Sequence, residues 1–498
     1  MPRREPARPW EDGPALPPVM TGPLHFDLLG EQGGLEHGWD DPQRSALWTY
    51  NLHYFDDLRR AGWRGRKDWH RTLVSRWITE NPPPIGVGWD AYPTSLRIVN
   101  WIAWDLAAGL LTEHARICLA SQAEWLSRSL ETHLLGNHLF ANLKALVFAG
   151  SYFDGAVADR WMGIAVARLE RELGEQVLND GGNFELSPMY HSIFLADLID
   201  LVNLSDVFPG RISNGLVERL RETAGRMLGW LAAMTHPDGE IAQFNDAALG
   251  VAPALAQLEG YAASVGIERS SVGKRLVGAN VEALHLADTG YVRLETDHAV
   301  AICDVALVGP DYLPGHAHAD TLSYELSVGS RRIVVNGGTS QYGLGPGRLR
   351  ERSTVSHSTV EIAGLSSSEV WSGFRVGRRA CPFDVTLEAL DVGVRLAASH
   401  DGYKRLAGAP IHRRSWTMRQ GELIVEDTVR GGGHVAVARH ILHPAYAHAM
   451  AGGPEFATSP PYELTPARHA PRFGESIITQ AIAVPLLNGA AEVRWSWR

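Results

Sequence analysis

The chain has 498 residues, which is too many for a single hydrophobic core and predicts two or three domains. Apolar residues make up 45% and charged residues 20% of the sequence, an ordinary globular composition, and no apolar stretch is long enough to span a bilayer. The net charge of -10 gives no overall attraction for a polyanion. This argues against nucleic acid as a partner, and an acidic substrate would need a local basic cleft.

The cysteines and the first residues bear on the cellular compartment. The sequence contains Cys118, Cys303 and Cys381, widely spaced and odd in number, which argues against a disulfide framework and a thiolate metal cluster. The N-terminal residues run from basic charge into Pro, Glu and Asp, without the apolar stretch of a secretory signal. We therefore expect a cytoplasmic protein, and a periplasmic or secreted location would require a different natural start.

The first half of the chain is predicted to be helical. Residues 1–44 form an N-terminal extension, and a helical domain is expected over 45–285. From about Trp48 to about Val265, apolar residues recur at three- and four-residue spacing in blocks of helical length. Such helices must bury their apolar faces against one another as a bundle, a solenoid or a closed ring. Since no repeat of fixed period is visible, a regular solenoid is disfavoured.

The second half is predicted to be an antiparallel β-sandwich over 286–498. After about Ala287 the pattern changes to short β-branched runs with near alternation, such as TGYVRLETD, TLSYELSVG and GELIVEDTVRG. Turn residues separate these runs at strand-length intervals. The segment from Ala451 to Ser476 is rich in Pro, Ala, Gly and Ser and predicts a surface loop before the closing strands.

The densest group of reactive side chains is the run GHAHAD at 315–320. In an extended chain, residues two apart point to one face, which brings together His316, His318 and Asp320. Two imidazoles and a carboxylate on one side indicate a metal site or an acid/base site. The alternative is a surface loop with incidental histidines, since the chain has 21 of them.

Further polar residues follow in the same half. Asn336 ends a predicted strand and could offer an amide oxygen to a metal, although Asn is also common turn chemistry. His357 stands at the head of another predicted strand, where a single histidine is more often a hydrogen-bonded core residue. The basic cluster Arg348, Arg350 and Arg352 would either contact anionic sugar groups or form a solvated loop, and the second is commoner.

Two loop-to-helix entries in the helical half carry candidate residues. The run DGGNFELSPMYH at 180–191 predicts a helix with Ser187 as N-cap and Pro188 at its first position. Tyr190 would then lie near the positive helix end, which favours its phenolate; the alternative is a packing role. In LGNHLFANLK at 135–144, Asn137 is either an N-cap or an exposed amide that binds a carboxylate.

Taken together, these segments resemble the heparinase II/III-like family of polysaccharide lyases from about Trp48 to about Pro444. The pieces that carry the resemblance are WDAYPTSLRIVNW, LLGNHLFANLKALVFAG, GGNFELSPMYH, HPDGEIAQFND, PGHAHADTLSYELSVGSRRIVVNGG and RSTVSHSTVEI. The resemblance implies an incomplete α/α toroid followed by an antiparallel β-sandwich. It also implies that Asn137 neutralises a uronate carboxylate, that Tyr190 protonates the leaving oxygen, and that His316 acts as base or assists it.

The resemblance implies further site residues. In metal-containing members two histidines and an aspartate hold a zinc-like structural ion, and the matching positions are His318, Asn336 and His357. The neutral amide of Asn336 replaces the carboxylate and should weaken such a site considerably. The substrate-binding positions that the resemblance implies are His138, His191, Glu185 and Arg97.

The function predicted from the resemblance is β-elimination on an acidic, uronate-containing polysaccharide. Removal of the C5 proton places charge on the adjoining carboxylate, so the reaction needs a carboxylate donor, a base and an acid. Two alternatives remain. A glycoside hydrolase would need paired carboxylates, for which Glu240 and Asp246 are the best candidates. A non-catalytic glycan-binding protein of a surface-polysaccharide pathway would keep the cleft without turnover.

Overall fold

The computed structural model describes residues 1–448 and 453–497. They form two compact units. The helical unit comprises 1–177, 192–228 and 256–270, and the sheet unit comprises 178–191, 229–255 and the described residues from 271 onward. Two short segments from the helical half of the sequence therefore belong to the sheet unit, and they carry much of the site described below.

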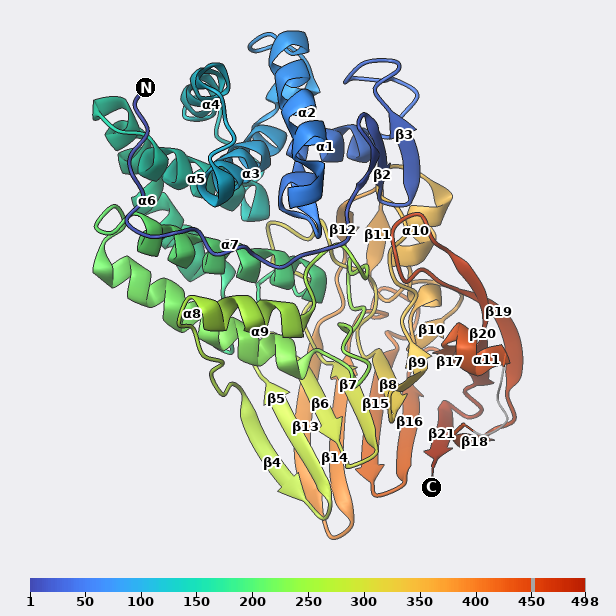
Figure 1. Ribbon diagram of the computed structural model, residues 1–498. Helices are drawn as coiled ribbons and strands as arrows, with labels where there is room; N and C mark the ends of the chain where they lie inside the picture. Colours follow the sequence, from blue (N-terminus) through green and yellow to red (C-terminus); the bar gives the residue numbers. More distant parts are fainter. Residues whose placement is uncertain (449–452, 498) are drawn as a thin grey trace. The chain divides into compact units, whose positions relative to one another are not determined.

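The helical unit is built from successive helices (Figure 1). They bury aromatic and aliphatic side chains. Trp77, Trp101 and Trp104 are fully buried, so these early aromatics form core. Within 1–448 and 453–497, no helix has the length and apolarity needed to cross a membrane. The helices are α1 (Ala46–Tyr54), α2 (Lys67–Glu80), α3 (Ala91–Ala108), α4 (Glu113–Leu126), α5 (Gly136–Tyr152), α6 (Ala156–Gln176), α7 (Pro188–Val207), α8 (Asn214–Ala233) and α9 (Leu255–Ser264).

The N-terminal extension contains a small antiparallel sheet of its own. Its strands are β1 (Met20–Gly22), β2 (His25–Leu28) and β3 (Glu31–Gly34). The 3₁₀ turns η1 (Asp56–Arg59), η2 (Trp63–Arg66) and η3 (Val87–Trp89) connect the first helices. The extension is therefore a folded part of the helical unit.

Two antiparallel sheets form most of the sheet unit. The first has the order β19-β20-β17-β9-β8-β7-β6-β5-β4, with β10 paired to β17, and the second has the order β13-β14-β15-β16-β21-β18. The first consists of β4 (Lys274–Gly278), β5 (Val281–Leu286), β6 (Tyr291–Glu295), β7 (Ala299–Asp304), β8 (Tyr324–Val328), β9 (Arg331–Val335), β10 (Val360–Ile362), β17 (Ala436–Leu442), β19 (Glu463–His469) and β20 (Ile477–Pro485).

The second sheet packs against the first. One apolar core, which includes Tyr324, Trp416 and Trp495, joins residues of both sheets, and β4 and β5 contact β13 and β14 (Figure 1). The second sheet consists of β13 (Pro382–Leu390), β14 (Gly393–His400), β15 (Ile411–Arg419), β16 (Glu422–Arg430), β18 (Glu455–Ser459) and β21 (Ala490–Ser496). The remaining elements are the hairpin of β11 (Glu369–Trp371) and β12 (Arg375–Gly377) and the short helices α10 (Pro346–Arg352), η4 (Thr354–Ser356) and α11 (Pro444–His448).

The predicted fold class, a helical toroid domain followed by an antiparallel β-sandwich, is confirmed. Two details differ from the prediction. The sandwich already begins at β4, so the expected boundary at 285/286 falls inside β5. The stretch expected to be a loop before the closing strands contains β18 and β19, because strands near a sheet edge tolerate the Pro residues that suggested a loop. Positions 451 and 452 of that stretch lie outside the described residues.

Candidate active site

The first turn of α7 places Tyr190 as the sequence predicts. Ser187 caps the helix: its Oγ accepts a hydrogen bond from the backbone N–H of Tyr190 at 3.2 Å. The same hydroxyl donates to the backbone carbonyl of Asp246 at 2.6 Å. One serine therefore fixes the start of α7 against the turn that carries Asp246, and all three residues belong to the sheet unit.

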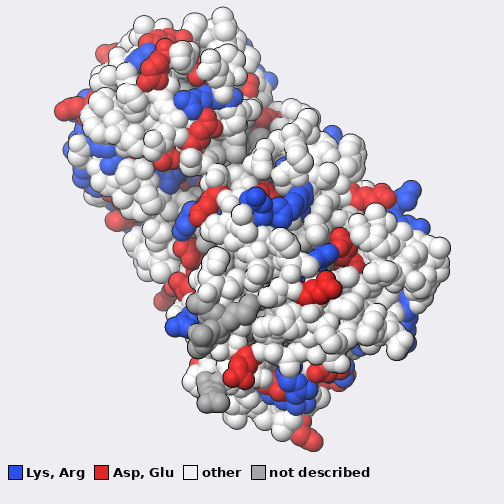
Figure 2. Space-filling model, turned by 90° about the vertical axis from the view of Figure 1, so that its right-hand side faces the viewer, with Lys and Arg blue, Asp and Glu red and all other residues white. Residues whose placement is uncertain are grey.

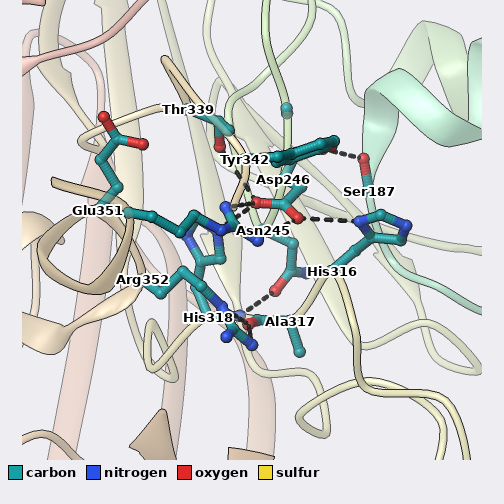
Figure 3. A network of polar contacts seen from close by, with 12 residues as sticks. Ser187, Asn245, Asp246, His316, Ala317, His318, Thr339, Tyr342, Glu351 and Arg352 are labelled. Atoms are coloured by element: carbon teal, nitrogen blue, oxygen red, sulfur yellow. Dashed lines mark hydrogen bonds and ion pairs between the residues drawn. The ribbon is translucent and has the colours of Figure 1, made fainter. Parts of the chain in front are cut away.

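Asp246 is the centre of the site (Figure 3). Its fully buried carboxylate lies 2.9 Å from Nδ1 of His316 and 2.8 Å from Nε2 of His318. Arg348 donates to both carboxylate oxygens, with Nη2 at 2.6 Å from Oδ2. His316 and His318 therefore share a face, as the alternation predicts, and what they face together is a carboxylate.

The charges of this network follow from its surroundings. Burial alone would raise the pKa of Asp246, but the Arg348 guanidinium and the hydrogen bonds from both histidines hold that pKa well below its usual range. Burial lowers the pKa of His318 to about 4, against the opposing effect of Asp246. At neutral pH the site thus contains an ionised Asp246 paired with Arg348, next to a neutral His318.

A left-handed turn holds Asp246 in this position. Asn245 has φ 56°, its Oδ1 accepts from the backbone N–H of His318 at 3.0 Å, and its Nδ2 donates to the Leu186 carbonyl at 2.9 Å. Asp320 accepts from the Asn245 backbone N–H at 3.2 Å. Asn tolerates the left-handed conformation because its short side chain can bond locally. The 316–320 segment is therefore held against the Asn245–Asp246 turn at several points.

Tyr190 and His316 lie side by side. Their ring centroids are 3.9 Å apart, and the Tyr190 hydroxyl is 2.9 Å from the hydroxyl of Tyr342. Nε2 of His316 lies 3.5 Å from a carboxylate oxygen of Glu185, and the His316 side chain remains 16% exposed. Carboxylates thus flank both ring nitrogens. The structure brings a phenol and a potential base together at a point that solvent reaches.

Asn137 and His138 lie in the helical unit, at the start of α5. Both are half-buried in the first turn, where the positive helix end favours an anion. Leu135 occupies the N-cap position, so Asn137 is not the cap. His138 stacks on Tyr92 with ring centroids 4.3 Å apart, and its Nδ1 lies 3.1 Å from a Glu131 oxygen. These contacts hold the His138 ring in place beside Asn137.

Two of the predicted substrate-binding residues are core residues instead. Arg97 is fully buried in the helical unit, where it donates to Gln122 and to backbone carbonyls, and burial lowers its pKa to about 9. His191 is fully buried in the sheet unit, stacks on Trp230 at 4.3 Å and accepts from the Asn183 backbone N–H. Neither side chain is placed to meet a polymer arriving from solvent, because packing within each unit uses its polar atoms.

Two of the predicted metal ligands, His318 and His357, lie side by side, but the donor set with Asn336 does not suit a divalent metal. Nδ1 of His318 lies 3.3 Å from Nε2 of His357, and Oδ1 of Asn336 accepts from the Ser358 backbone N–H at 3.3 Å. Nδ2 of Asn336 is buried and has no hydrogen-bond partner among the described residues. Within the same residues, no three His, Cys, Asp or Glu side chains form a group that could hold a metal. The position lacks the anionic ligand that a zinc-like ion prefers.

Several residues of the site were not predicted from the sequence, or were predicted to have another role. Tyr342 lies in a glycine-rich loop without periodicity, and its only signal is an aromatic in SQYGLGPG. Arg348 and Arg352 are fully buried, so the solvated loop expected for them is wrong; Arg350 alone of that cluster is exposed. Asp246 was a candidate for hydrolytic catalysis, but a buried carboxylate already bound to Arg348 and two histidines cannot activate water for a sugar.

Comparison with known proteins shows the family to which the chain belongs. The model for the heparinase II/III N-terminus matches residues 105–264, and the heparinase II/III-like C-terminal model matches 279–472. The chain belongs to the heparinase II/III-like family. The second match contains the 316–320 segment, Asn336, Tyr342 and Arg348, and the first contains Asn137 and Tyr190.

Individual members of the heparinase II/III-like family are more distant. A heparin-sulfate lyase of Bacteroides stercoris is 31% identical over 115 residues, covering 23% of this chain and 17% of the relative. A heparin-sulfate lyase of Pedobacter heparinus is 26% identical over 260 residues, covering 48% of this chain and 38% of the relative. The matched region thus spans less than half the length of these curated relatives.

Solved structures show the same fold. The crystal structure of heparinase III superposes with a TM-score of 0.70 at 16% identity, covering 94% of this chain and 79% of that one. A chondroitin AC lyase of Streptomyces coelicolor A3 superposes with a TM-score of 0.50 at 9% identity, covering 96% of this chain and 77% of that one. At these identities the similarity establishes architecture, and the chemistry must be argued from the site.

Proposed function

We propose that this protein is a polysaccharide lyase that cleaves a uronate-containing glycan by β-elimination. The observation that carries the proposal is the close contact of the Tyr190 and His316 rings, with the buried Asp246 carboxylate hydrogen-bonded to Nδ1 of His316. An acid and a base are thus adjacent, and a charge fixes the orientation of the base. A hydrolase is disfavoured because the carboxylate best placed to serve it is sequestered by Arg348.

The reaction follows from these positions. Because the ionised Asp246 accepts a hydrogen bond from Nδ1 of His316, Nε2 carries the lone pair and takes the C5 proton of the uronate. The electron pair left by that proton forms the C4–C5 double bond while the C4–O bond breaks. Tyr190 gives its proton to the departing oxygen, which completes the elimination without water. The Tyr342 hydroxyl, 2.9 Å from that of Tyr190, orients the phenol.

The family resemblance assigns the carboxylate of the sugar to Asn137, with His138 beside it. A neutral amide at a helix N-terminus supplies N–H donors, which stabilise the charge that develops on the carboxylate during proton removal. The resemblance also assigns substrate contact to Glu185, a buried residue whose carboxylate lies 3.5 Å from Nε2 of His316. No step of this scheme passes through a metal ion.

The proposed substrate is an acidic glycosaminoglycan of the heparan type. Two relatives bear the name heparin-sulfate lyase. On the face shown in Figure 2, basic and acidic side chains are interspersed among uncharged ones, with no extended field of one sign. Recognition of such a substrate would therefore depend on individual basic side chains near the site rather than on the field of a whole surface.

The proposal is tested by the product. Purified protein is incubated with heparan sulfate, hyaluronan, chondroitin and alginate, and the ultraviolet absorbance of an unsaturated uronate is followed. Elimination produces this absorbance and hydrolysis does not. Tyr190→Phe should lower the rate by about 10²- to 10⁴-fold because only the transferable proton is removed, whereas Tyr462→Phe, on an exposed tyrosine, is the matched control. Chain cleavage without absorbance, or full activity of Tyr190→Phe, would refute the scheme.

A further inference from the structure

The β11–β12 hairpin displays aromatic side chains next to the candidate active site. Trp371 is 57% exposed and Phe374 is 41% exposed. The Phe374 ring lies 6.1 Å from the ring of His316 and 5.4 Å from that of Tyr342, centroid to centroid. Trp371 is three residues from Phe374, a span of at most about 11 Å. The backbone of Trp371 therefore lies within about 11 Å of that of Phe374, whose ring neighbours the proposed base.

Two buried arginines fix this hairpin to the catalytic segment. Arg348, which binds Asp246, also donates from Nε to the carbonyl of Gly373 at the hairpin tip, at 3.1 Å. Arg352 donates to the Arg375 carbonyl at 3.3 Å and, through Nε and Nη2, to the Ala317 carbonyl at 3.1 and 2.9 Å. Ala317 lies between the two histidines of the site. The hairpin is thus held rigidly relative to His316, although its outer face is exposed.

The charge of the hairpin suits an anionic ligand. Arg375 lies directly opposite Trp371 in the strand pairing and is exposed. Across residues 1–448 and 453–497, its guanidinium has no ion-pair partner, whereas the neighbouring Arg378 pairs with Glu369 at 3.4 Å. An indole and an uncompensated guanidinium therefore stand side by side on a two-stranded ribbon. Single exposed aromatic side chains are common on protein surfaces. An exposed Trp on a hairpin that is fixed near a base, opposite an Arg without an ion-pair partner among the described residues, instead indicates a ligand-binding surface.

We propose that the β11–β12 hairpin is a sugar-binding subsite for the acidic glycan, next to the residue that is cleaved. The indole of Trp371 stacks on the apolar face of a sugar ring, and the Arg375 guanidinium binds a carboxylate or sulfate of the same or the next sugar. This inference rests on the proposed function for the identity of the ligand. It assigns to the hairpin a share of substrate affinity and a preference for chains long enough to reach it.

Binding is measured by calorimetry in a Tyr190→Phe background, with size-fractionated heparan sulfate octasaccharides and tetrasaccharides as probes. Trp371→Ala should weaken octasaccharide binding by about tenfold, the loss of one aromatic stacking contact. Arg375→Ala should weaken it similarly and make it less dependent on salt. Because the subsite adjoins the cleaved residue, tetrasaccharide binding should weaken as well. The matched controls are Tyr462→Ala and Arg331→Ala, which alter an exposed aromatic and an exposed arginine elsewhere in the sheet unit.

Kinetics with the intact Tyr190 separate this inference from the proposed function. Trp371→Ala should raise KM with kcat nearly unchanged, because the subsite binds ground state and transition state alike. Wild-type affinity and KM in both Trp371→Ala and Arg375→Ala would overturn the subsite while leaving the lyase proposal intact. Absence of an unsaturated product from the unmodified protein, together with weaker octasaccharide binding by Trp371→Ala, would overturn the lyase proposal and support the subsite. Equal binding by every variant and control would also overturn the subsite.

Discussion

Replacing Asp246 with Asn tests the centre of the proposed mechanism. The amide keeps the size of the side chain but removes the charge that faces the Arg348 guanidinium, which is fully buried. Breaking a buried ion pair by removing one partner costs roughly 3–5 kcal/mol of unfolding free energy. The amide N–H₂ also donates where the carboxylate accepted, so the neighbouring imidazole must turn its proton to Nε2. The base nitrogen of His316 is then blocked, and we expect kcat to fall on the order of 10³- to 10⁴-fold, as in other enzymes whose base is oriented by a carboxylate.

Stability and activity can be separated by a second substitution. Urea unfolding gives the free energy of unfolding, and the absorbance of the unsaturated uronate gives kcat. In Asp246→Asn/Arg348→Met the unpaired guanidinium is gone, so we expect much of the lost stability to return while activity stays low. The reasoning would be refuted if Asp246→Asn kept wild-type kcat, or if the double variant regained activity along with stability.

Three further outcomes are expected. Tyr342→Phe removes the hydrogen bond to Tyr190 with little change of shape and should lower kcat about tenfold at unchanged KM; an unchanged kcat would exclude an orienting role. Asn336→Asp restores an anionic ligand beside the paired histidines and should tighten zinc binding by the metal-stripped protein, measured by calorimetry; equal affinity in both proteins would contradict this. Burial raises the pKa of Asp320 to about 6 and that of Asp304 well above its usual range. Since these folded-state values exceed the unfolded value of about 3.9, the stabilising effect is complete below pH about 4 and is lost as the pH rises through about 6. Urea unfolding between pH 4 and 8 should show this decline and a weaker one for Asp304→Asn, and a flat profile for the unmodified protein would contradict the argument.

The sequence predicts the fold well because period and composition report directly on burial. Helical spacing of apolar residues and alternation in the β-rich half correspond to α1–α9 and to the sandwich. It misplaces the boundary because β4 and β5 are short and their residues are less regularly β-branched, as in KRLVG and VEALHL. Contact between the segments 178–191 or 229–255 and the sheets is a long-range property that no local pattern encodes.

The candidate site is predictable to the extent that it is local. Ser187, Pro188 and Tyr190 follow from helix-start chemistry, and His316 and His318 from alternation. The network around Asp246 is not local, because its partner Arg348 lies 102 residues further along the chain. For the same reason the burial of Arg97 could not be predicted: an Arg in an amphipathic helix is usually exposed, and only its neighbours in space show that it is buried.

Helix α7 begins in the sheet unit and continues into the helical unit, so Tyr190 belongs to the same compact body as His316, Asp246 and Tyr342. The donor and acceptor of the proton transfer therefore keep their mutual geometry whatever displacement the helical body undergoes. For protein engineering, substitutions confined to the helical body would leave the contact between the Tyr190 and His316 rings intact.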